Sequence, residues 1–199
     1  MLKFVLIGGS FMKHNRNSLR SIKMLKLSFL QLLKEKDISK ITVTEVTDLA
    51  NLTRNTFYAH FEDVYAINEA IEDEVISKTI EFIDASFNVE LTIDSLVFFK
   101  TIMSDIDKDR ELLNALLQHG NAASFINKYS SRIIDHVLNN LGEFKLIDKV
   151  GFTIFLKVLF SGSVFIIRQY LDGELDLTID EIAEKLNSIF LNCYKAYIE

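Results

Sequence analysis

The sequence predicts an all-helical protein of about nine helices. Its 199 residues include no proline and only 7 glycines, so the residue that most often breaks helices is missing. Apolar residues recur at spacings of three and four through most of the chain, which is the period of an amphipathic helix, and no stretch of useful length alternates as a strand does. With 49% apolar residues the chain can bury a substantial core.

Apolar stripes and end signals place the individual helices. In the first helix, Leu25 and Phe29 lie four residues apart on one face. Near the other end of the chain, Thr178 followed by Glu181 has the spacing of a capping box. Glycines fall in several of the breaks between helices. The expected helices cover residues 18–36, 42–50, 54–61, 63–86, 93–106, 109–119, 121–141, 148–172 and 178–197.

The helix over residues 63–86 is expected to be a long connecting element. Asp63 can cap its start, and at ~1.5 Å per residue it would span roughly 35 Å. No linker-like stretch interrupts it, so the N-terminal and C-terminal parts of the chain are expected to share it. Its apolar stripe is expected at Val64, Ile67, Ile71, Val75 and Phe82.

The segment 42–61 predicts two short helices joined by a tight corner. Thr42 and Glu45 have the spacing of a capping box at the first helix start. The corner falls at Asn51, one of the few residues besides glycine that tolerate a left-handed backbone. Thr53 is a good cap for the second helix. This is the shape of a helix-turn-helix whose second helix can enter a DNA major groove.

Each of these two helices has an apolar face and a polar one. In the first helix Val46, Leu49 and Ala50 are expected to face the core, and in the second Phe57 and Phe61, four residues apart, are expected to be buried. The side chains left near the outward N-terminal end of the second helix are Arg54, Asn55, Thr56 and Tyr58.

The same segment resembles a known family signature. Read as Thr-Val-x-Glu-Val-x-x-x-Ala-x-Leu-Thr-Arg-x-Thr-Phe-Tyr-x-His-Phe, it is similar to the motif of the TetR/AcrR family of transcription regulators, and its most specific part is residues 56–61. The resemblance covers residues 18–75. Two positions depart from the family pattern: Asn51 stands where glycine is usual, and Val64 stands where a phosphate-contacting lysine is usual.

The resemblance implies a domain order and a function. An N-terminal arm (1–17) would precede a DNA-binding domain (18–62) and a helical effector-binding and dimerisation domain (63–199). The protein would be a homodimeric repressor on a pseudo-palindromic operator of double-stranded DNA. An apolar small-molecule effector would release it, and no cofactor would be needed.

Eight side chains of the helix-turn-helix are candidates for DNA contact. Thr42 and Thr44, at a helix start, can hydrogen-bond phosphate. At base edges arginine favours guanine, asparagine favours adenine, and a threonine methyl can meet a thymine methyl, which makes Arg54, Asn55 and Thr56 the candidates there. The eight are Thr42, Thr44, Thr53, Arg54, Asn55, Thr56, Tyr58 and His60.

Some of these candidates have a simpler explanation. By the family resemblance, Tyr58 and His60 contact backbone phosphates. Thr53 and Thr56 can instead serve only as local caps, and Tyr58 can be a half-buried packing aromatic. Both explanations stay open at these positions.

Charge is distributed unevenly along the chain. Residues 1–61 hold 10 Lys and Arg against 4 Asp and Glu, a balance of +6, whereas the remaining residues hold 12 against 24, a balance of −12. Such asymmetry suggests that the N-terminal part meets an anion. Arg16 and Arg20, at the start of the first helix, can contact phosphate or can form a solvated face.

The middle of the chain is rich in aromatic residues. The resemblance implies an apolar pocket for a small effector among these helices, and the alternative is that the same side chains only fill the core. The candidate pocket residues are Phe82, Phe98, Phe99, Met103, His119, Phe125 and Tyr129.

The last two helices are both apolar enough to need a partner surface. Residues 150–167 are long enough to span a membrane, but Lys157 in their middle would be costly in lipid, so we expect a helix buried almost all round in protein and no membrane contact. The resemblance implies that both helices form a four-helix dimer interface with a second copy. The candidate interface residues are Phe155, Leu159, Ser163, Ile166, Ile182, Leu186, Ile189 and Cys193.

Catalytic and metal chemistry find little support. The four histidines show no ligand spacing, and no glycine-rich phosphate loop follows a strand, so we expect neither an enzyme nor a metal site. The single cysteine, Cys193, cannot form an internal disulfide, and residues 1–11 contain too short an apolar run for a signal peptide, which together predict a cytoplasmic protein. Two alternatives remain: a DNA-binding regulator with a protein partner or no ligand, and a helical carrier or enzyme that does not bind DNA.

Overall fold

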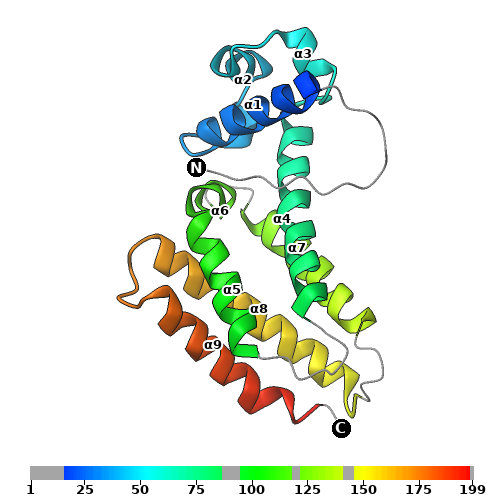
Figure 1. The fold of residues 1–199 in the computed structure, drawn as a ribbon, viewed down its shortest axis with the longest axis vertical. Helices are drawn as coiled ribbons and strands as arrows, with labels where there is room; N and C mark the ends of the chain where they lie inside the picture. The colour runs from blue at the N-terminus through cyan, green and yellow to red at the C-terminus, as the bar shows by residue number, and fades with distance from the viewer. Residues whose placement is uncertain (1–15, 87–94, 118–121, 141–145, 198–199) are drawn as a thin grey trace. The chain divides into compact units, whose positions relative to one another are not determined.

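The computed structural model describes residues 16–86, 95–117, 122–140 and 146–197. These residues form nine α-helices and one short 3-10 helix, and they contain no extended strand (Figure 1). The prediction of an all-helical fold with about nine helices is therefore confirmed. The α-helices are α1 (Arg16–Leu33), α2 (Val43–Ala50), α3 (Arg54–Tyr58), α4 (Val64–Ser86), α5 (Ser95–Lys108), α6 (Arg110–Leu117), α7 (Ala122–Asn139), α8 (Lys149–Leu171) and α9 (Ile179–Tyr194).

The chain divides into two compact units, and the division falls inside α4. The first unit includes the residues up to Ile71, and the second begins at Glu72. We call them the head, which contains α1 to α3 and the start of α4, and the body, which contains the rest of α4 and α5 to α9.

The head is organised around a small set of fully buried apolar side chains. Leu25 and Phe29 of α1, Val46 of α2, Phe57 of α3 and Ile67 of α4 are all completely inaccessible to solvent. Each such side chain contributes about 1.5–3 kcal/mol through the hydrophobic effect. Because these side chains come from four helices, the same core fixes how α2 and α3 lie on α1 and the start of α4.

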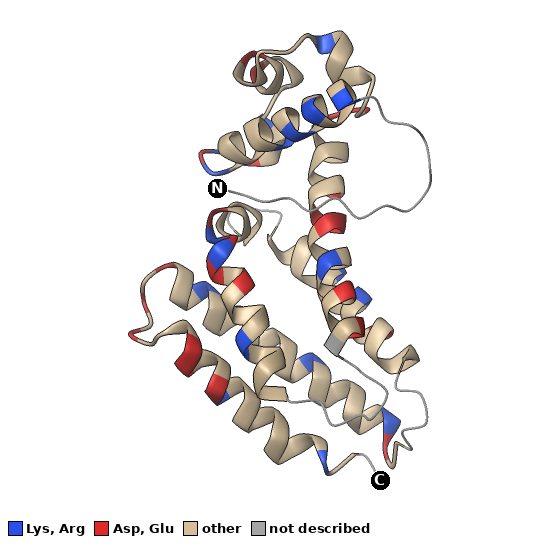
Figure 2. Cartoon of the chain, viewed as in Figure 1, with Lys and Arg blue, Asp and Glu red and all other residues tan. Residues whose placement is uncertain are grey.

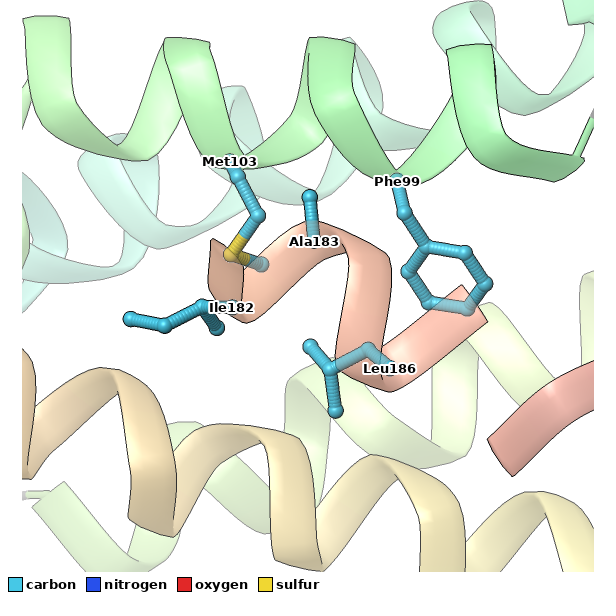
Figure 3. Packing of buried hydrophobic residues seen from close by; sticks show 5 residues of the cluster. All are labelled: Phe99, Met103, Ile182, Ala183 and Leu186. Atoms are coloured by element: carbon cyan, nitrogen blue, oxygen red, sulfur yellow. The ribbon is translucent and has the colours of Figure 1, made fainter. Parts of the chain in front are cut away.

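The body is held together by the packing of α5 against α9. Phe99 and Met103 of α5 point toward Ile182, Ala183 and Leu186 of α9, and all five side chains are buried (Figure 3). This cluster lies within one chain and joins helices that are far apart in the sequence. Side chains of α8, including Leu159 and Ile166, pack against the same cluster and are partly buried.

Helix α4 changes its buried face along its length. The predicted stripe holds as far as Ile71. Beyond it, Ile76 and Ile83 are the buried residues and pack with Ile133 of α7. The predicted positions Val75 and Phe82 are only partly buried. The stripe shifts because this half of the helix has different neighbours, which spacing along α4 alone does not reveal.

The prediction that α8 is buried almost all round is wrong. Only 11% of its most apolar window is buried, and by length and composition alone this helix could cross a membrane. Phe152 and Phe155 are buried in the core of the body, but Val150 and Val158 are 71% and 66% exposed. Helix α8 therefore has one face in the chain's own core and one apolar face on the surface of the chain. The exposed large apolar side chains of α8 are Val150, Ile154, Val158 and Phe165.

Candidate nucleic-acid interface

Helix α2 begins with the predicted capping box. The Thr42 hydroxyl accepts a hydrogen bond from the Glu45 backbone N–H at 3.3 Å, and the Glu45 carboxylate accepts one from the Thr42 backbone N–H at 2.9 Å. Two of the backbone donors that a helix start leaves unpaired are thereby satisfied. The start of α2 is fixed by residues within one turn of each other.

The corner between α2 and α3 has the conformation that the sequence predicts. Asn51 ends α2 with φ 52° and ψ 46°, and it is the only non-glycine residue with positive φ among those described. Thr53 then caps α3, since its hydroxyl accepts from the Thr56 backbone N–H at 3.1 Å. Asparagine at this position does what glycine does in the family pattern, because its short polar side chain tolerates the left-handed region.

A single buried side chain anchors α3. Phe57 is fully buried, and its ring packs edge-on to Tyr58 at 5.4 Å and against Phe61 at 6.0 Å between ring centroids. The regular helix ends at Tyr58, three residues earlier than predicted. His60 and Phe61 both donate backbone hydrogen bonds to the Phe57 carbonyl, so the chain tightens into a turn after that residue.

Seven of the eight predicted DNA contacts lie on α2, α3 and their N-caps, and the eighth, His60, lies in the turn just after α3. Arg54 and Asn55 are exposed at the start of α3, and Tyr58 is 58% exposed although it follows the buried Phe57. The capping threonines Thr42 and Thr53 are also exposed, while three others are partly buried: Thr44, Thr56 and His60. Two apolar predictions fail here: Leu49 is 45% exposed and does not enter the core, and Phe61 is only partly buried.

One contact in this region was not anticipated from the sequence. Nη2 of Arg54 donates a hydrogen bond to Oγ1 of Thr44 at 2.6 Å. The sequence treats these residues separately, Thr44 as a phosphate contact and Arg54 as a base contact, since they are ten positions apart on different helices. The geometry of the corner brings them together.

One ion pair joins Glu45 of α2 to Lys36, which follows α1. Lys36 binds the Glu45 carboxylate, and this hydrogen bond, followed by those from Thr42, lowers the pKa of Glu45 to about 2. The carboxylate is therefore ionised and already occupied at neutral pH. On α1, Arg16 and Arg20 are exposed, and Figure 2 shows lysine and arginine spread along this helix.

The predicted pocket residues lie in different parts of the body. Phe99 and Met103 are buried in the α5–α9 core. Phe82 stacks on Phe98 at 5.6 Å, and Phe98 meets Phe99 edge-on at 5.5 Å. His119 lies outside the described residues.

A second aromatic group involves α7 and α8. The ring of Tyr129 lies 5.7 Å from that of Phe125 and 5.2 Å from that of Phe160. Its hydroxyl is 2.9 Å from that of Thr79, and burial raises the pKa of the Tyr129 phenol despite this hydrogen bond. The phenol is therefore neutral at physiological pH and can be either donor or acceptor.

The predicted dimer-interface list needs a correction. Phe155, Ile182 and Leu186 are buried in the body's own core, and Ile182 is only 1% exposed, so these side chains cannot form an outer contact face. Ile189 is 51% exposed, as an interface residue should be. The remaining candidates are partly buried: Leu159, Ser163, Ile166 and Cys193. The recurrence of apolar residues at spacings of three and four correctly predicts an apolar stripe on α9. It does not reveal that the stripe packs on α5 of the same chain.

These features define a class of protein: an all-helical chain with a helix-turn-helix head and a helical body. No protein-family model matches the chain, and no curated protein matches it by sequence. Solved structures do match. A putative TetR-family transcriptional regulator from Syntrophomonas wolfei is 17% identical with a TM-score of 0.68, over 89% of this chain and 95% of that one.

Two further structures match over similar lengths. NalD of Pseudomonas aeruginosa, the secondary repressor of the MexAB-OprM multidrug efflux pump, is 16% identical with a TM-score of 0.66, over 93% of this chain and 99% of that chain. SmeT, solved as a complex with triclosan, is 13% identical with a TM-score of 0.68, over 90% and 92%. The chain therefore has the fold of TetR-family transcription regulators, as the motif at residues 42–61 predicts.

Proposed function

We propose that the protein is a homodimeric, sequence-specific DNA-binding regulator that represses transcription and is released from its operator by a small molecule. The observation that carries the proposal is the capped helix-turn-helix, which presents Arg54, Asn55 and Tyr58 as exposed side chains on α3. With α3 in a major groove, the first two would reach base edges. Similarity to TetR-family structures supports the same conclusion.

Phosphate contacts would come from both sides of α3. The start of α2, with Thr42, offers a hydroxyl and helix amides. Tyr58, the last residue of α3, and His60, just after it, would meet the backbone at the other end of the reading helix. Arg20 on α1 would add sequence-independent affinity that falls with salt. On this assignment the DNA-binding domain is residues 18–62, and residues 63–199 serve effector binding and dimerisation.

The apolar face of α8 supports a dimer. Val150, Ile154, Val158 and Phe165 are exposed on a helix whose other face is buried, and Ile189 and Leu191 of α9 are exposed as well. A second copy would cover such a face without placing Lys157 in lipid, which is why we assign the face to self-association in the cytoplasm and not to a membrane. Two heads would then meet half-sites about 34–36 Å apart or somewhat more.

A matched pair of variants tests the dimer. Val158→Glu places a charge in the proposed interface and should shift the protein from dimer to monomer in sedimentation velocity at micromolar concentration. Val97→Glu is the control, since Val97 is similarly exposed at 57% but lies on α5. A monomeric wild type, or equal behaviour of the two variants, would contradict the assignment.

The effector is proposed to be apolar and to bind the body. SmeT has been solved with triclosan, and the body of this chain contains the aromatic group around Tyr129, where a partly buried hydroxyl offers one polar contact. The ligand must bind the released state better than the DNA-bound state, since only differential affinity shifts the equilibrium. A regulator without a small ligand is the second candidate, because Phe99 and Met103 are used in core packing.

Selection of bound sequences from a random duplex pool at physiological salt tests the proposed function. We expect an enriched inverted repeat whose half-sites are about one duplex turn apart or slightly more. No enrichment by the folded dimer would argue for a helical carrier instead. The sign of regulation would follow from reporter expression with the selected operator placed over a promoter.

Two arginine variants then separate base reading from phosphate contact. Arg54→Ala should weaken the selected operator more than random DNA. Arg20→Ala should weaken both by the same factor and reduce the salt slope by about one. Equal losses for the two variants would rule out base reading by Arg54.

A further inference from the structure

We propose that Thr44 is a positioning residue for Arg54: its hydroxyl holds the guanidinium in the orientation that reads a guanine. Thr44 would then contribute to base specificity, a role beyond the phosphate contact that its place at a helix start suggests. The inference rests on the proposed DNA-binding function, and its test is arranged so that the two can fail separately.

The contact itself is short and crosses the corner of the helix-turn-helix. Nη2 of Arg54 lies 2.6 Å from Oγ1 of Thr44, and the hydroxyl accepts. Arg54 is the first residue of α3, and Thr44 is the second residue of α2. A hydrogen bond from a charged donor is shorter and stronger than a neutral one. The far end of the arginine side chain is therefore tied to a different helix from the one that carries its backbone.

Other contacts fix both residues of this hydrogen bond. The Thr44 carbonyl accepts a hydrogen bond from the hydroxyl of Thr47 at 3.0 Å, and Thr47 is buried. The start of α3, where Arg54 sits, is capped by Thr53. Because α2 and α3 are both anchored in the head core, the hydroxyl is presented to the guanidinium by a rigid part of the structure.

The nearby acidic side chain does not compete for the guanidinium. Glu45 follows Thr44 directly, but its carboxylate already accepts hydrogen bonds from Lys36 and Thr42. A carboxylate on Arg54 would neutralise its charge and occupy two donors at once. A hydroxyl accepts one hydrogen bond and does not neutralise the positive charge. The guanidinium therefore keeps its charge and its other donors for DNA.

The donor geometry leaves the reading edge of Arg54 intact. A guanidinium has five N–H donors in one plane, and Nη2 contributes one hydrogen to each of the two two-donor edges, which it shares with Nε and with Nη1. Whichever Nη2 hydrogen Thr44 accepts, one complete two-donor edge remains for O6 and N7 of a guanine. The Thr44 hydroxyl also keeps its own hydrogen, which can be donated to a phosphate, so one threonine would link the reading side chain to the DNA backbone.

The test measures base preference for four variants on the selected operator. Arg54→Ala identifies the base pair that Arg54 reads, because the variant loses its preference at that position. The preference of the wild type for guanine there is expected to fall by about fivefold or more. Thr44→Val keeps the branched shape and removes the hydroxyl, and it should lower preference at that same base pair by at least about threefold. Thr44→Ser keeps a hydroxyl and should retain the preference. In the double variant Thr44→Val with Arg54→Ala, the preference should fall no further than in Arg54→Ala alone.

Other outcomes overturn the inference in recognisable ways. If Thr44→Val weakens every duplex by the same factor, its role is a phosphate contact only. If Thr44→Val still lowers preference when Arg54 is absent, the threonine acts independently of the arginine. If the folded wild type selects no duplex at all, the proposed function fails and this inference with it.

A measurement without DNA checks the contact directly. In the free protein, relaxation of the Arg54 Nε–H group by NMR should report a restricted side chain, compared with Arg20, which is also exposed. Thr44→Val should make Arg54 as mobile as Arg20, and Thr44→Ser should not. An Arg54 side chain that is already as mobile as Arg20 in the wild type overturns the inference, whatever the protein binds.

Discussion

The contacts that shape the helix-turn-helix of the head and those that hold the helices of the body together span very different distances along the chain. In the head, the contacts that shape the helix-turn-helix join residues three apart, as in the pairs Thr42–Glu45 and Thr53–Thr56. In the body, a buried hydrogen bond of 2.6 Å joins Ser95 to Asn187, 92 positions away. The difference explains why the helix caps and the corner of the head could be predicted from sequence, whereas the neighbours of the body helices could not.

The helix ends show the same contrast. In the body, Arg110 at the start of α6 donates hydrogen bonds to the Tyr170 and Leu171 carbonyls at the end of α8, at 3.1 and 3.0 Å. Arg168 of α8 in turn donates to the Leu117 carbonyl at the end of α6, at 3.1 Å. Each helix thus caps the last carbonyls of the other. Arginine near a helix end signals such a role only when the neighbouring helix is known.

The largest expected effect is in the core of the head. Phe57→Ala removes a fully buried ring, which typically costs 3 to about 5 kcal/mol in free energy of unfolding. Native-state hydrogen exchange should show loss of protection in α1 to α3 and little change in α9. The control is Leu49→Ala, whose side chain is exposed and which should change stability by less than about 0.5 kcal/mol. Equal loss of protection in α9 would mean that the two units unfold together.

The next effect breaks the long-range contact of the body. Ser95→Ala leaves the buried Asn187 side chain without its partner, which should cost about 1–3 kcal/mol. Replacing both residues by apolar ones of similar size, Ser95→Ala with Asn187→Leu, should recover part of the loss, because no buried polar group is then unpaired. Urea unfolding followed by circular dichroism measures both. A double variant less stable than the single one would contradict this account.

The sequence predicted those parts of the candidate site that depend on local geometry. The capping box at Thr42, the left-handed corner at Asn51 and the cap at Thr53 all follow from preferences of single residues in one turn of chain. The contact between Arg54 and Thr44 does not, because it depends on the angle between two helices. Whether these residues touch DNA stays a prediction.

In the body, periodicity gave the helices but not their neighbours. The stripe of α9 at Ile182 and Leu186 was recognised, yet it packs on α5 of the same chain and not on a partner. The exposed row of α8 was expected to be buried because its composition is apolar almost all round. Composition decides that a helix needs apolar contact, and only the arrangement of the other helices decides whether the chain itself supplies it.

A smaller effect tests the corner of the head. A residue with a Cβ in the left-handed region costs roughly 1–2 kcal/mol, a penalty that asparagine partly avoids and glycine avoids entirely. Asn51→Ala should therefore lower the free energy of unfolding of the head by about 1 kcal/mol, and Asn51→Gly should leave it nearly unchanged. Hydrogen exchange of α2 and α3 amides separates the two. An alanine variant as stable as the wild type would show that the corner relaxes to another conformation.

The smallest effect compares the two capping boxes, one in each unit. Both carboxylates have lowered pKa values. That of Glu45 falls to about 2, mainly through the hydrogen bond from Lys36, whereas that of Glu181 is lowered chiefly by hydrogen bonds from Thr178. A carboxyl with a lowered pKa binds its proton more weakly in the folded state, so its contribution to stability is complete above the unfolded value and is lost as pH falls toward the folded one.

For Glu45 this window runs from pH about 4.5 down to about 2. In Glu45→Gln the acid side of the stability profile of the head should therefore be flatter than in the wild type, with the two curves converging toward pH 2. Lys36→Met should also flatten the acid side of the head's stability profile, but by a smaller amount, because the hydrogen bonds from Thr42 remain. Glu181→Gln should leave the head profile unchanged and alter only that of the body. Hydrogen exchange between pH 3 and 6, followed separately in α2 and α9, resolves the two units. A head profile that Glu45→Gln does not change would mean that neither the ion pair with Lys36 nor the hydrogen bonds from Thr42 lower the pKa of Glu45 in solution.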